Sequence, residues 1–121
     1  MTRAGCSADT HCHIHSSDYP LGPSEVLTSA LDSGVSRIIT MGCDPADSEL
    51  AVRYALKQGR PEGLILRAGV GIYPHQAGDF RSSDIDRLQT LIDANRRVIA
   101  AVGEVGLDYC YGTVPQIGRA H

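Results

Sequence analysis

The sequence predicts an α/β fold in which a parallel sheet is wound as the first part of an eight-stranded (β/α)8 barrel. Short apolar runs and amphipathic segments alternate strictly along the 121 residues, which is the order of right-handed βαβ units. The run Arg37–Met41 is almost wholly apolar, as expected of a strand buried on both faces. An open, doubly wound sheet is the alternative. No Gly-x-Gly-x-x-Gly follows the first predicted strand, however, so a dinucleotide-binding sheet is disfavoured.

The first third of the chain contains two predicted strands with a helix between them. The first strand is expected over about Cys6–His13, where the pattern is weak, and the second over Arg37–Met41. Leu21-Gly22-Pro23 forms a turn, and Ser24–Ser33 has the periodicity of an amphipathic helix. Gly34 is expected to end this helix, because glycine readily adopts the left-handed conformation found at helix C-termini.

Two further helices and two further strands follow. In chain order they are a helix capped by Asp44 and ending near Gln58, a strand over Leu64–Val70, a helix capped by Ser83 or Asp84, and a strand over Val98–Val102. The helix residues expected to face the sheet are Val26, Leu27, Ala30 and Leu31, then Leu50, Ala51, Tyr54 and Ala55, then Ile85, Leu88, Leu91 and Ile92. Each set follows the three- and four-residue spacing of a single helix face.

The composition restricts the partners that the protein can bind. The formal net charge is −3 and no run of Lys or Arg occurs, so the broad basic footprint needed for duplex DNA is absent. Aromatic residues are scarce, with five Tyr, one Phe and no Trp, so the composition indicates no surface for stacking nucleic-acid bases. If the substrate is anionic, something other than surface lysines must attract it, and a metal ion would do so.

The cysteines and the apolar runs indicate the compartment. The four cysteines form no Cys-x-x-Cys pair, which argues against a structural zinc knuckle, and their scattered spacing is not a disulfide framework. We therefore expect reduced thiols in a cytoplasmic protein. The N-terminal residues lack the apolar segment of a signal peptide, and no apolar run approaches the roughly 20 residues of a membrane span, so no membrane association is expected.

The segment Asp9-Thr10-His11-Cys12-His13 carries the first candidate site. Because His11 and His13 are two apart, a strand points both imidazoles to the same side. Two neutral imidazoles on one face suit Zn²⁺, Mn²⁺ or Fe²⁺. Cys12 points the other way and is expected in the core, and Asp9 is a candidate to orient a ligand histidine. A chance pair of histidines is the alternative, but barrel chemistry occurs where strands end, which favours a metal site.

Further polar residues follow the later strands. Glu104 ends the fourth strand, and the glycines near it allow a ligand or another backbone segment to come close. Its carboxylate is therefore expected at the same end of the barrel as the two histidines, with a solvated strand-end Glu as the alternative. His75, in the loop after the third strand, is a candidate to contact a substrate phosphate, or else a surface histidine. Asp108 either supports a metal or caps a turn. His15 lies past the first strand and is not assigned as a ligand.

Three motifs resemble the N-terminal motifs of the TatD family, in the order and at the spacing of that family. They are Asp-Thr-His-Cys-His-Ile (9–14), Val-Gly-Ile-Tyr-Pro-His (70–75) and Gly-Glu-Val-Gly-Leu-Asp-Tyr (103–109). Together they are far more specific than His-x-His alone, and the resemblance covers about residues 7–111. Members of this family are metal-dependent deoxyribonucleases with a (β/α)8 barrel of the TIM type, related to the amidohydrolases.

The resemblance implies a site and an activity. His11, His13 and Glu104 are its metal ligands, and Glu104 is able to bridge two divalent ions, which would be Mg²⁺, Mn²⁺ or Zn²⁺. The implied substrate is DNA, hydrolysed exonucleolytically at its phosphodiester bonds by a metal-activated water. His75, from its place in the loop after the third strand, stays the candidate substrate-binding residue. Metal ions would also allow an acidic protein to engage phosphates.

The sequence departs from the family pattern in three ways. His15 stands where the family usually has an acidic or amide residue, and Tyr73 where it often has histidine. A complete barrel needs about 250 residues, and the family's two later histidines and late aspartate have no counterpart here, so no catalytic residue is assigned. We expect residues 1–111 to be the N-terminal half of a TatD-like barrel. Residues 112–121 fall outside the pattern and are expected to be a product of truncation.

Two alternative functions remain open. Asp-x-His-x-His with a nearby Ser17-Asp18 also occurs in phosphoesterases of the polymerase-and-histidinol-phosphatase type, although the 103–109 motif argues against them. The other alternative is a catalytically incomplete fragment that retains some metal binding, and for the 121 residues as given we favour it over independent activity. The unpaired edges of the first and fourth strands would then favour self-association.

Overall fold

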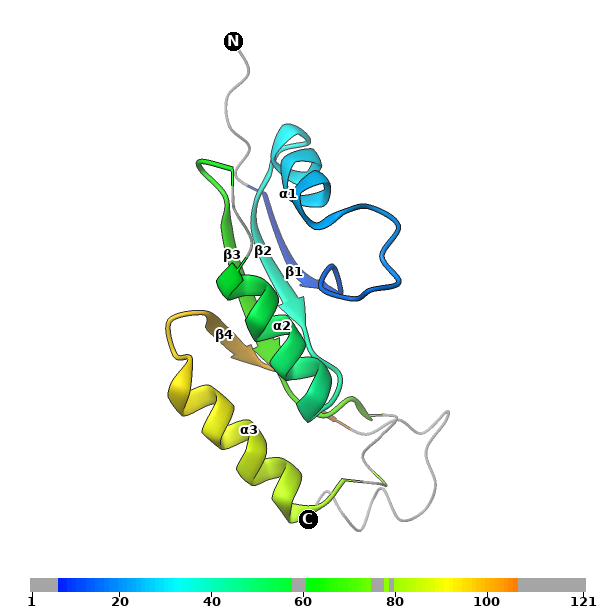
Figure 1. Ribbon diagram of the computed structural model, residues 1–121, viewed down its shortest axis with the longest axis vertical. Helices are drawn as coiled ribbons and strands as arrows, with labels where there is room; N and C mark the ends of the chain where they lie inside the picture. The colour runs from blue at the N-terminus through cyan, green and yellow to red at the C-terminus, as the bar shows by residue number, and fades with distance from the viewer. Residues whose placement is uncertain (1–6, 58–60, 75–77, 79, 107–121) are drawn as a thin grey trace.

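The computed structural model describes residues 7–57, 61–74, 78 and 80–106, and strands and helices alternate through it (Figure 1). The elements are β1 (Ser7–Cys12), α1 (Pro23–Asp32), β2 (Val35–Met41), α2 (Pro45–Lys57), β3 (Ile65–Val70), α3 (Ser82–Ala94) and β4 (Ile99–Val102). This order confirms the predicted alternation of four strands and three helices. Within the described ranges, no helix has both the length and the apolar character needed to cross a membrane.

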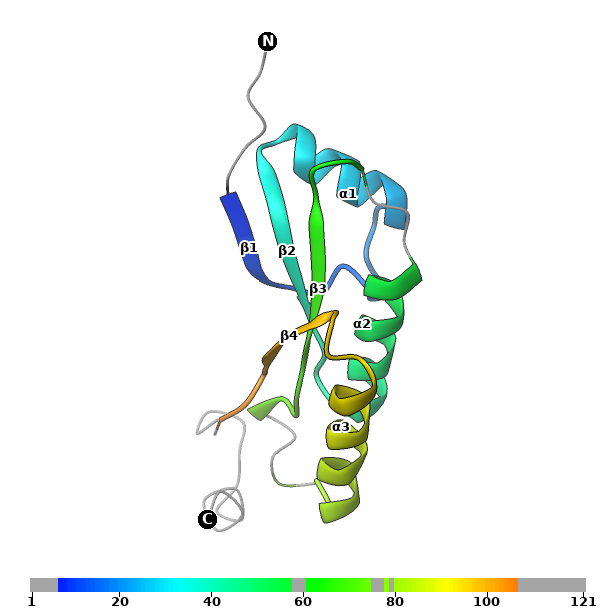
Figure 2. The ribbon, with the colours of Figure 1, turned by 90° about the vertical axis from the view of Figure 1, so that its left-hand side faces the viewer.

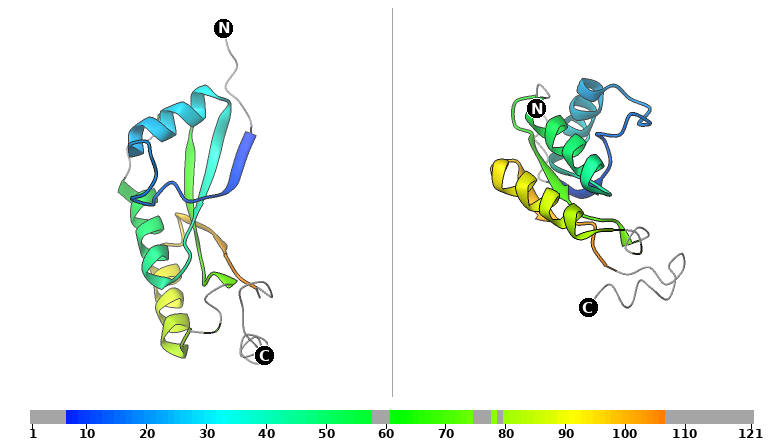
Figure 3. Two further views of the ribbon diagram at one scale, coloured as in Figure 1. Left: turned by 90° about the vertical axis from the view of Figure 1, so that its right-hand side faces the viewer. Right: turned by 60° about the horizontal axis from the view of Figure 1, so that its bottom comes forward.

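The sheet has the winding of a barrel. All three strand pairs are parallel, and the spatial order β1-β2-β3-β4 is the chain order. The three helices lie on the same side of this sheet (Figures 2 and 3). A doubly wound sheet reverses its strand order and places helices on both faces. The arrangement therefore confirms the predicted barrel-type fold and excludes the open alternative for this part of the chain.

The register brings the ends of the four strands level. Cys12 pairs with Thr40, Met41 with Gly69, and Val70 with Val102. The segments that follow the strands therefore all leave from one edge of the sheet, which we call the C-terminal edge. In barrels this edge carries the chemistry.

The core lies between the sheet and the helices. Leu66, Ala68 and Val70 of β3 have no exposed surface and pack with the apolar side of α2. Because side chains alternate along a strand, Ile65 lies on the opposite face, where it is 42% exposed. Val102 is 64% exposed. No helix among the described residues covers that face, which corresponds to the inside of a barrel.

The edges of the sheet are open within the described residues. β1 pairs with β2 and β4 pairs with β3, and neither strand has a second neighbour there. Side chains from Ser7 to His11 are exposed. The self-association through these edges that the sequence suggested stays a prediction.

Several expected helix boundaries are confirmed to within two residues. Asp44 caps α2, because its Oδ1 accepts the backbone N–H of Asp47 at 2.7 Å. Gly34 follows α1 with a φ of 96°, the left-handed conformation expected of it. The third helix differs: it begins at Ser82, and Asp84 in its first turn accepts the backbone N–H of Arg81 at 2.8 Å.

Two residues expected to face the sheet do not. Leu50 is 48% exposed, because α2 turns Ser48, Ala51 and Ala55 to the sheet and Leu50 lies about 200° around the helix from Ser48. Ser48 was overlooked as a core residue because it is polar, although it is fully buried. Ile85 is 49% exposed since the first turn of α3 extends beyond the N-terminal end of α2 (Figures 1 and 2).

The burial of Leu66 predicts a large stability loss on truncation. Leu66→Ala should lower the free energy of unfolding by about 2–5 kcal/mol, because it removes buried methyl groups and leaves a cavity. Urea denaturation followed by circular dichroism measures this loss. Leu50→Ala is the matched control, and its exposed side chain should make the change small. Equal losses for the two variants would contradict the placement of the core.

Candidate metal centre

Three predicted ligand side chains meet at the C-terminal edge of the sheet. His11 Nε2 lies 2.6 Å from Glu104 Oε1, and His13 Nε2 lies 3.4 Å from the same oxygen. One ligand atom from each residue can be chosen so that all lie within 4.8 Å of one another. His11 comes from β1 and Glu104 follows β4, so the cluster joins the two outer strands of the sheet.

The meeting of these outer strands requires a curved sheet. Neighbouring strands lie about 4.8 Å apart, so β1 and β4 in a flat sheet would be about 14 Å apart. A direct contact between His11 and Glu104 therefore means that the sheet curls toward its open face, as the front of a barrel does. The side chains of His11 and His13 are 53% and 41% exposed, whereas that of Glu104 is 14% exposed.

A backbone carbonyl fixes the orientation of His13. Its Nδ1 lies 2.8 Å from the carbonyl oxygen of Met41, at the end of β2. Because a carbonyl only accepts, Nδ1 carries the hydrogen, and in the neutral ring the lone pair is on Nε2. That nitrogen faces Glu104. Such a bond to the second nitrogen is how proteins commonly hold metal-binding histidines.

Asp9 does not have the role that the sequence suggested. Its Oδ1 accepts the backbone N–H of His11 at 3.0 Å, so it holds the backbone rather than an imidazole. The short Asp side chain reaches the N–H two residues on, which is a common local bond for this residue type. The expectation for Cys12 is confirmed, since its side chain packs against the core on the helix side.

Cys43 lies beside the cluster as a neutral thiol. Its Sγ is 4.0 Å from His13 Nδ1. Burial raises the pKa of this thiol to about 11, with further contributions from the negative charges of Asp47 and Glu104. Burial also raises the pKa of Cys12. Neither thiol is in a disulfide.

A close backbone approach places Glu104. A Cβ on Gly71 would lie 2.6 Å from the carbonyl atoms of Gly103 and from the carbonyl oxygen of Glu104. No real side chain tolerates such contacts, so this glycine allows the segments after β3 and β4 to touch. The backbone N–H of Gly71 donates to the buried Ser48 Oγ at 3.2 Å, which connects this contact to α2.

His15 was not assigned a role, and the structure shows it in a buried network. Its side chain is 1% exposed and lies between Thr40 and Asp47. One signal of this role was present in the sequence: His15 is separated by even numbers of residues from His11 and His13. His75 and Asp108, by contrast, lie outside the described residues.

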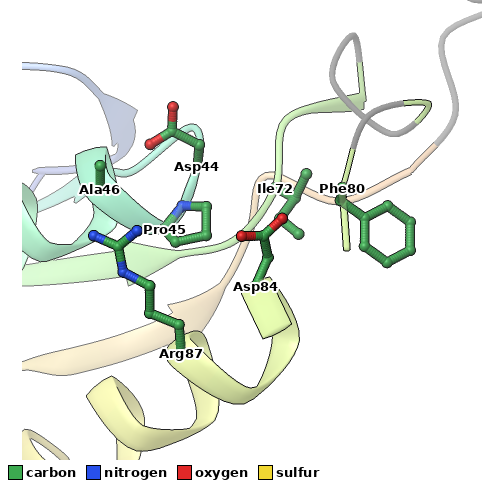
Figure 4. A pocket seen from close by; sticks show the side chains of 7 residues that line it. All are labelled: Asp44, Pro45, Ala46, Ile72, Phe80, Asp84 and Arg87. Carbon is green, nitrogen blue, oxygen red and sulfur yellow. The ribbon is translucent and has the colours of Figure 1, made fainter. Parts of the chain in front are cut away.

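A cavity of about 440 Å³ lies between the first turns of α2 and α3 (Figure 4). Its lining residues are Asp44, Pro45, Ala46, Ile72, Phe80, Asp84 and Arg87. None of the three clustered side chains lines it. Arg87 binds both carboxylate oxygens of Glu49, at 2.6 and 2.9 Å, so this guanidinium is already neutralised. The cavity is therefore a weaker candidate for the functional site than the cluster of His11, His13 and Glu104.

The donor set of the cluster fits a divalent metal ion. Two imidazole nitrogens and one carboxylate are typical ligands of Zn²⁺, Mn²⁺ and Fe²⁺. The hydrogen bond to Met41 leaves the Nε2 lone pair of His13 available for an ion. The partial exposure of both histidines gives a substrate access to the same atoms.

The contact at Gly71 predicts a selective effect on metal binding. Gly71→Ala should weaken Mn²⁺ binding by roughly 10-fold or more, because the added Cβ pushes Glu104 out of place. Isothermal titration calorimetry measures this change. Gly78→Ala is the matched control, since a Cβ there meets nothing within 4 Å. Equal Mn²⁺ affinities for the two variants would contradict the proposed role of Gly71.

Comparisons with known proteins agree with this geometry. A protein-family model described as "TatD related DNase" matches residues 8–117. The "Uncharacterized metal-dependent hydrolase YabD" of Bacillus subtilis is 30% identical over 108 residues, which are 89% of this chain and 40% of that protein. The "3'-5' ssDNA/RNA exonuclease TatD" of Cronobacter sakazakii is 33% identical over 101 residues, 84% of this chain and 36% of that protein.

A solved structure shows the same fold. The chain superposes on a hydrolase TatD family protein from Entamoeba histolytica with a TM-score of 0.81 at 21% identity, over 97% of this chain and 44% of that one. The chain thus spans about 40% of the length of the curated relatives it matches. Because the family model covers nearly all of the sequence, the chain belongs to the family of TatD-related DNases.

Proposed function

We propose that the protein, at the full length of its relatives, is a metal-dependent phosphodiesterase that hydrolyses DNA from an end. The observation that carries this proposal is the cluster of His11, His13 and Glu104 at the C-terminal edge of a barrel-type sheet. The names of the relatives support it, since one is called a metal-dependent hydrolase and another a 3'-5' exonuclease of single-stranded DNA and RNA.

Three side chains would hold the metal. His13 would bind through Nε2, because its Nδ1 donates to Met41, and His11 would bind through the nitrogen that now faces Glu104. Glu104 has two carboxylate oxygens and so could bridge a pair of ions. When bound, such ions supply an activated water and stabilise the charged oxygens of the phosphodiester. They would also attract a polyanion to a chain whose formal net charge is −3.

The rest of the active site is assigned only in part. We propose His75 as a residue that contacts the substrate phosphate, because it comes soon after β3 in the sequence. No described residue is proposed as the catalytic acid or base. DNA is the proposed substrate, and the relative's name makes single-stranded RNA the first competing substrate to test.

For the 121 residues by themselves we propose metal binding rather than hydrolysis. Within the described ranges, the three clustered side chains form the one group suited to an ion. Three ligands can hold an ion, but a hydrolase also needs groups that move protons during the reaction. The open inner face leaves the bound ion accessible to solvent, whereas a closed site strengthens electrostatic catalysis by excluding water.

The ligand assignment predicts loss of metal binding and of activity. His11→Ala and Glu104→Ala should each weaken Mn²⁺ binding to this chain by roughly 100-fold or more, because each removes a direct ligand. Calorimetry measures the binding, and a nuclease assay on the full-length protein with the same substitutions measures the activity. Glu62→Ala, which removes an exposed carboxylate after α2, is the control.

Retained Mn²⁺ affinity in both ligand variants would contradict the assignment. Retained nuclease activity in both full-length variants would contradict the proposed function. Circular dichroism on every variant shows whether the fold is preserved, so that a loss of binding can be attributed to the ligand.

A further inference from the structure

A polar network of His15, Thr40 and Asp47 lies next to the proposed metal ligand His13. The side chain of His15 is 1% exposed, and each of its ring nitrogens has a partner. Nδ1 lies 2.6 Å from Thr40 Oγ1, and Nε2 lies 3.0 Å from Asp47 Oδ1. Thr40 is fully buried, and the side chain of Asp47 is 28% exposed. Because burying polar groups is costly unless they are paired, this network is a specific feature and not a filler of the core.

The directions of the hydrogen bonds follow from the donors available. A carboxylate only accepts, so Nε2 of His15 donates to Asp47. The hydroxyl of Thr40 then donates to Nδ1 in the neutral ring. The other oxygen of Asp47 accepts the backbone N–H of Cys43 at 2.9 Å. Asp47 therefore joins His15 to the segment that connects β2 to α2.

This network spans the two segments that determine where His13 lies. His15 follows His13 by two residues, in the segment after β1. The partners of His15 lie at the end of β2 and in the first turn of α2, on either side of Met41 and Cys43. Met41 supplies the carbonyl that orients the His13 ring. The bonds of His15 thus hold the backbone of His13 next to the carbonyl that sets its ring.

His15 is unsuited to be a ligand itself. Both of its nitrogens are occupied by Thr40 and Asp47, and its side chain is nearly inaccessible. Its ring centroid lies 6.3 Å from that of His13, and the hydrogen bonds of its two nitrogens go to Thr40 and Asp47 instead. His15 can therefore act on an ion at the cluster only indirectly, through the residues that it positions.

We propose that His15, together with Asp47, is a positioning residue of the metal centre. The pair fixes the segment after β1 against the segment after β2, so that His13 Nδ1 meets the Met41 carbonyl and Nε2 faces Glu104. This inference rests on the proposed metal-binding function. It predicts that metal affinity depends on two residues that do not touch the metal.

Metal affinity in a double-mutant cycle tests the pairing. His15→Ala and Asp47→Ala should each weaken Mn²⁺ binding to the chain by roughly 10- to 100-fold, as the loss of groups that orient metal ligands does. The double variant should bind about as weakly as either single variant, because the two residues act as one unit. His15→Gln, whose amide can still donate to Asp47, should recover part of the affinity.

The metal-free protein gives an independent readout. In the wild-type chain, ¹⁵N NMR should show the His13 ring with its hydrogen on Nδ1. In His15→Ala this tautomer preference should be lost or reduced, although circular dichroism still reports a folded chain. A residue that only stabilised the fold would lower the melting temperature and leave the His13 tautomer of the folded molecules unchanged.

The outcomes separate this inference from the proposed function. If the wild-type chain and His13→Ala bind Mn²⁺ equally, the metal site itself is wrong. If His13→Ala loses binding while folded His15→Ala keeps wild-type affinity and the wild-type His13 tautomer, the positioning role is wrong. Should His15→Ala fail to fold, Asp47→Ala carries the same test, because it removes both oxygens that accept from His15 and Cys43.

Discussion

The contact between His11 and Glu104 is the constraint on which the site depends. The two residues belong to opposite outer strands of the sheet, yet Nε2 and Oε1 lie 2.6 Å apart. Such a distance exists only if the parallel strands end level and the sheet curls over its open face. The cluster is thus a consequence of barrel winding, and each bond that maintains the curvature also maintains the site.

Polar contacts at the ends of the strands help to hold this curvature in place. Ser48 binds the backbone of Gly71, and Gly71 touches the backbone on both sides of the Gly103–Glu104 peptide. On the other side, His15 and Asp47 join the segments after β1 and β2. No buried side-chain polar atom of the described residues lacks a partner. The site is therefore held by satisfied hydrogen bonds behind it, while the ligand side chains themselves remain accessible.

The sequence was sufficient for the alternation of elements, for the parallel sheet and for the meeting of the cluster residues. Those features depend on local periodicity and on the rule that parallel strands end at one edge. The pairing of His15 with Asp47 was not predictable, because it joins residues 32 apart through a loop geometry that no local pattern encodes. Leu50 was expected to face the sheet, but the polar Ser48 lies on that side of α2. Its buried hydroxyl accepts the backbone N–H of Gly71, a contact that local periodicity does not reveal. The role expected for Asp9 was wrong because its carboxylate accepts the nearby backbone N–H of His11 and does not orient an imidazole.

NMR with paramagnetic Mn²⁺ can show whether a metal ion binds among His11, His13 and Glu104. Substoichiometric Mn²⁺ broadens the resonances of nuclei near the ion, so the pattern of broadening locates the site without an activity assay. The ring resonances of His11 and His13 should disappear first. Broadening centred instead on Asp44 and Asp84, at the cavity between α2 and α3, would contradict this site.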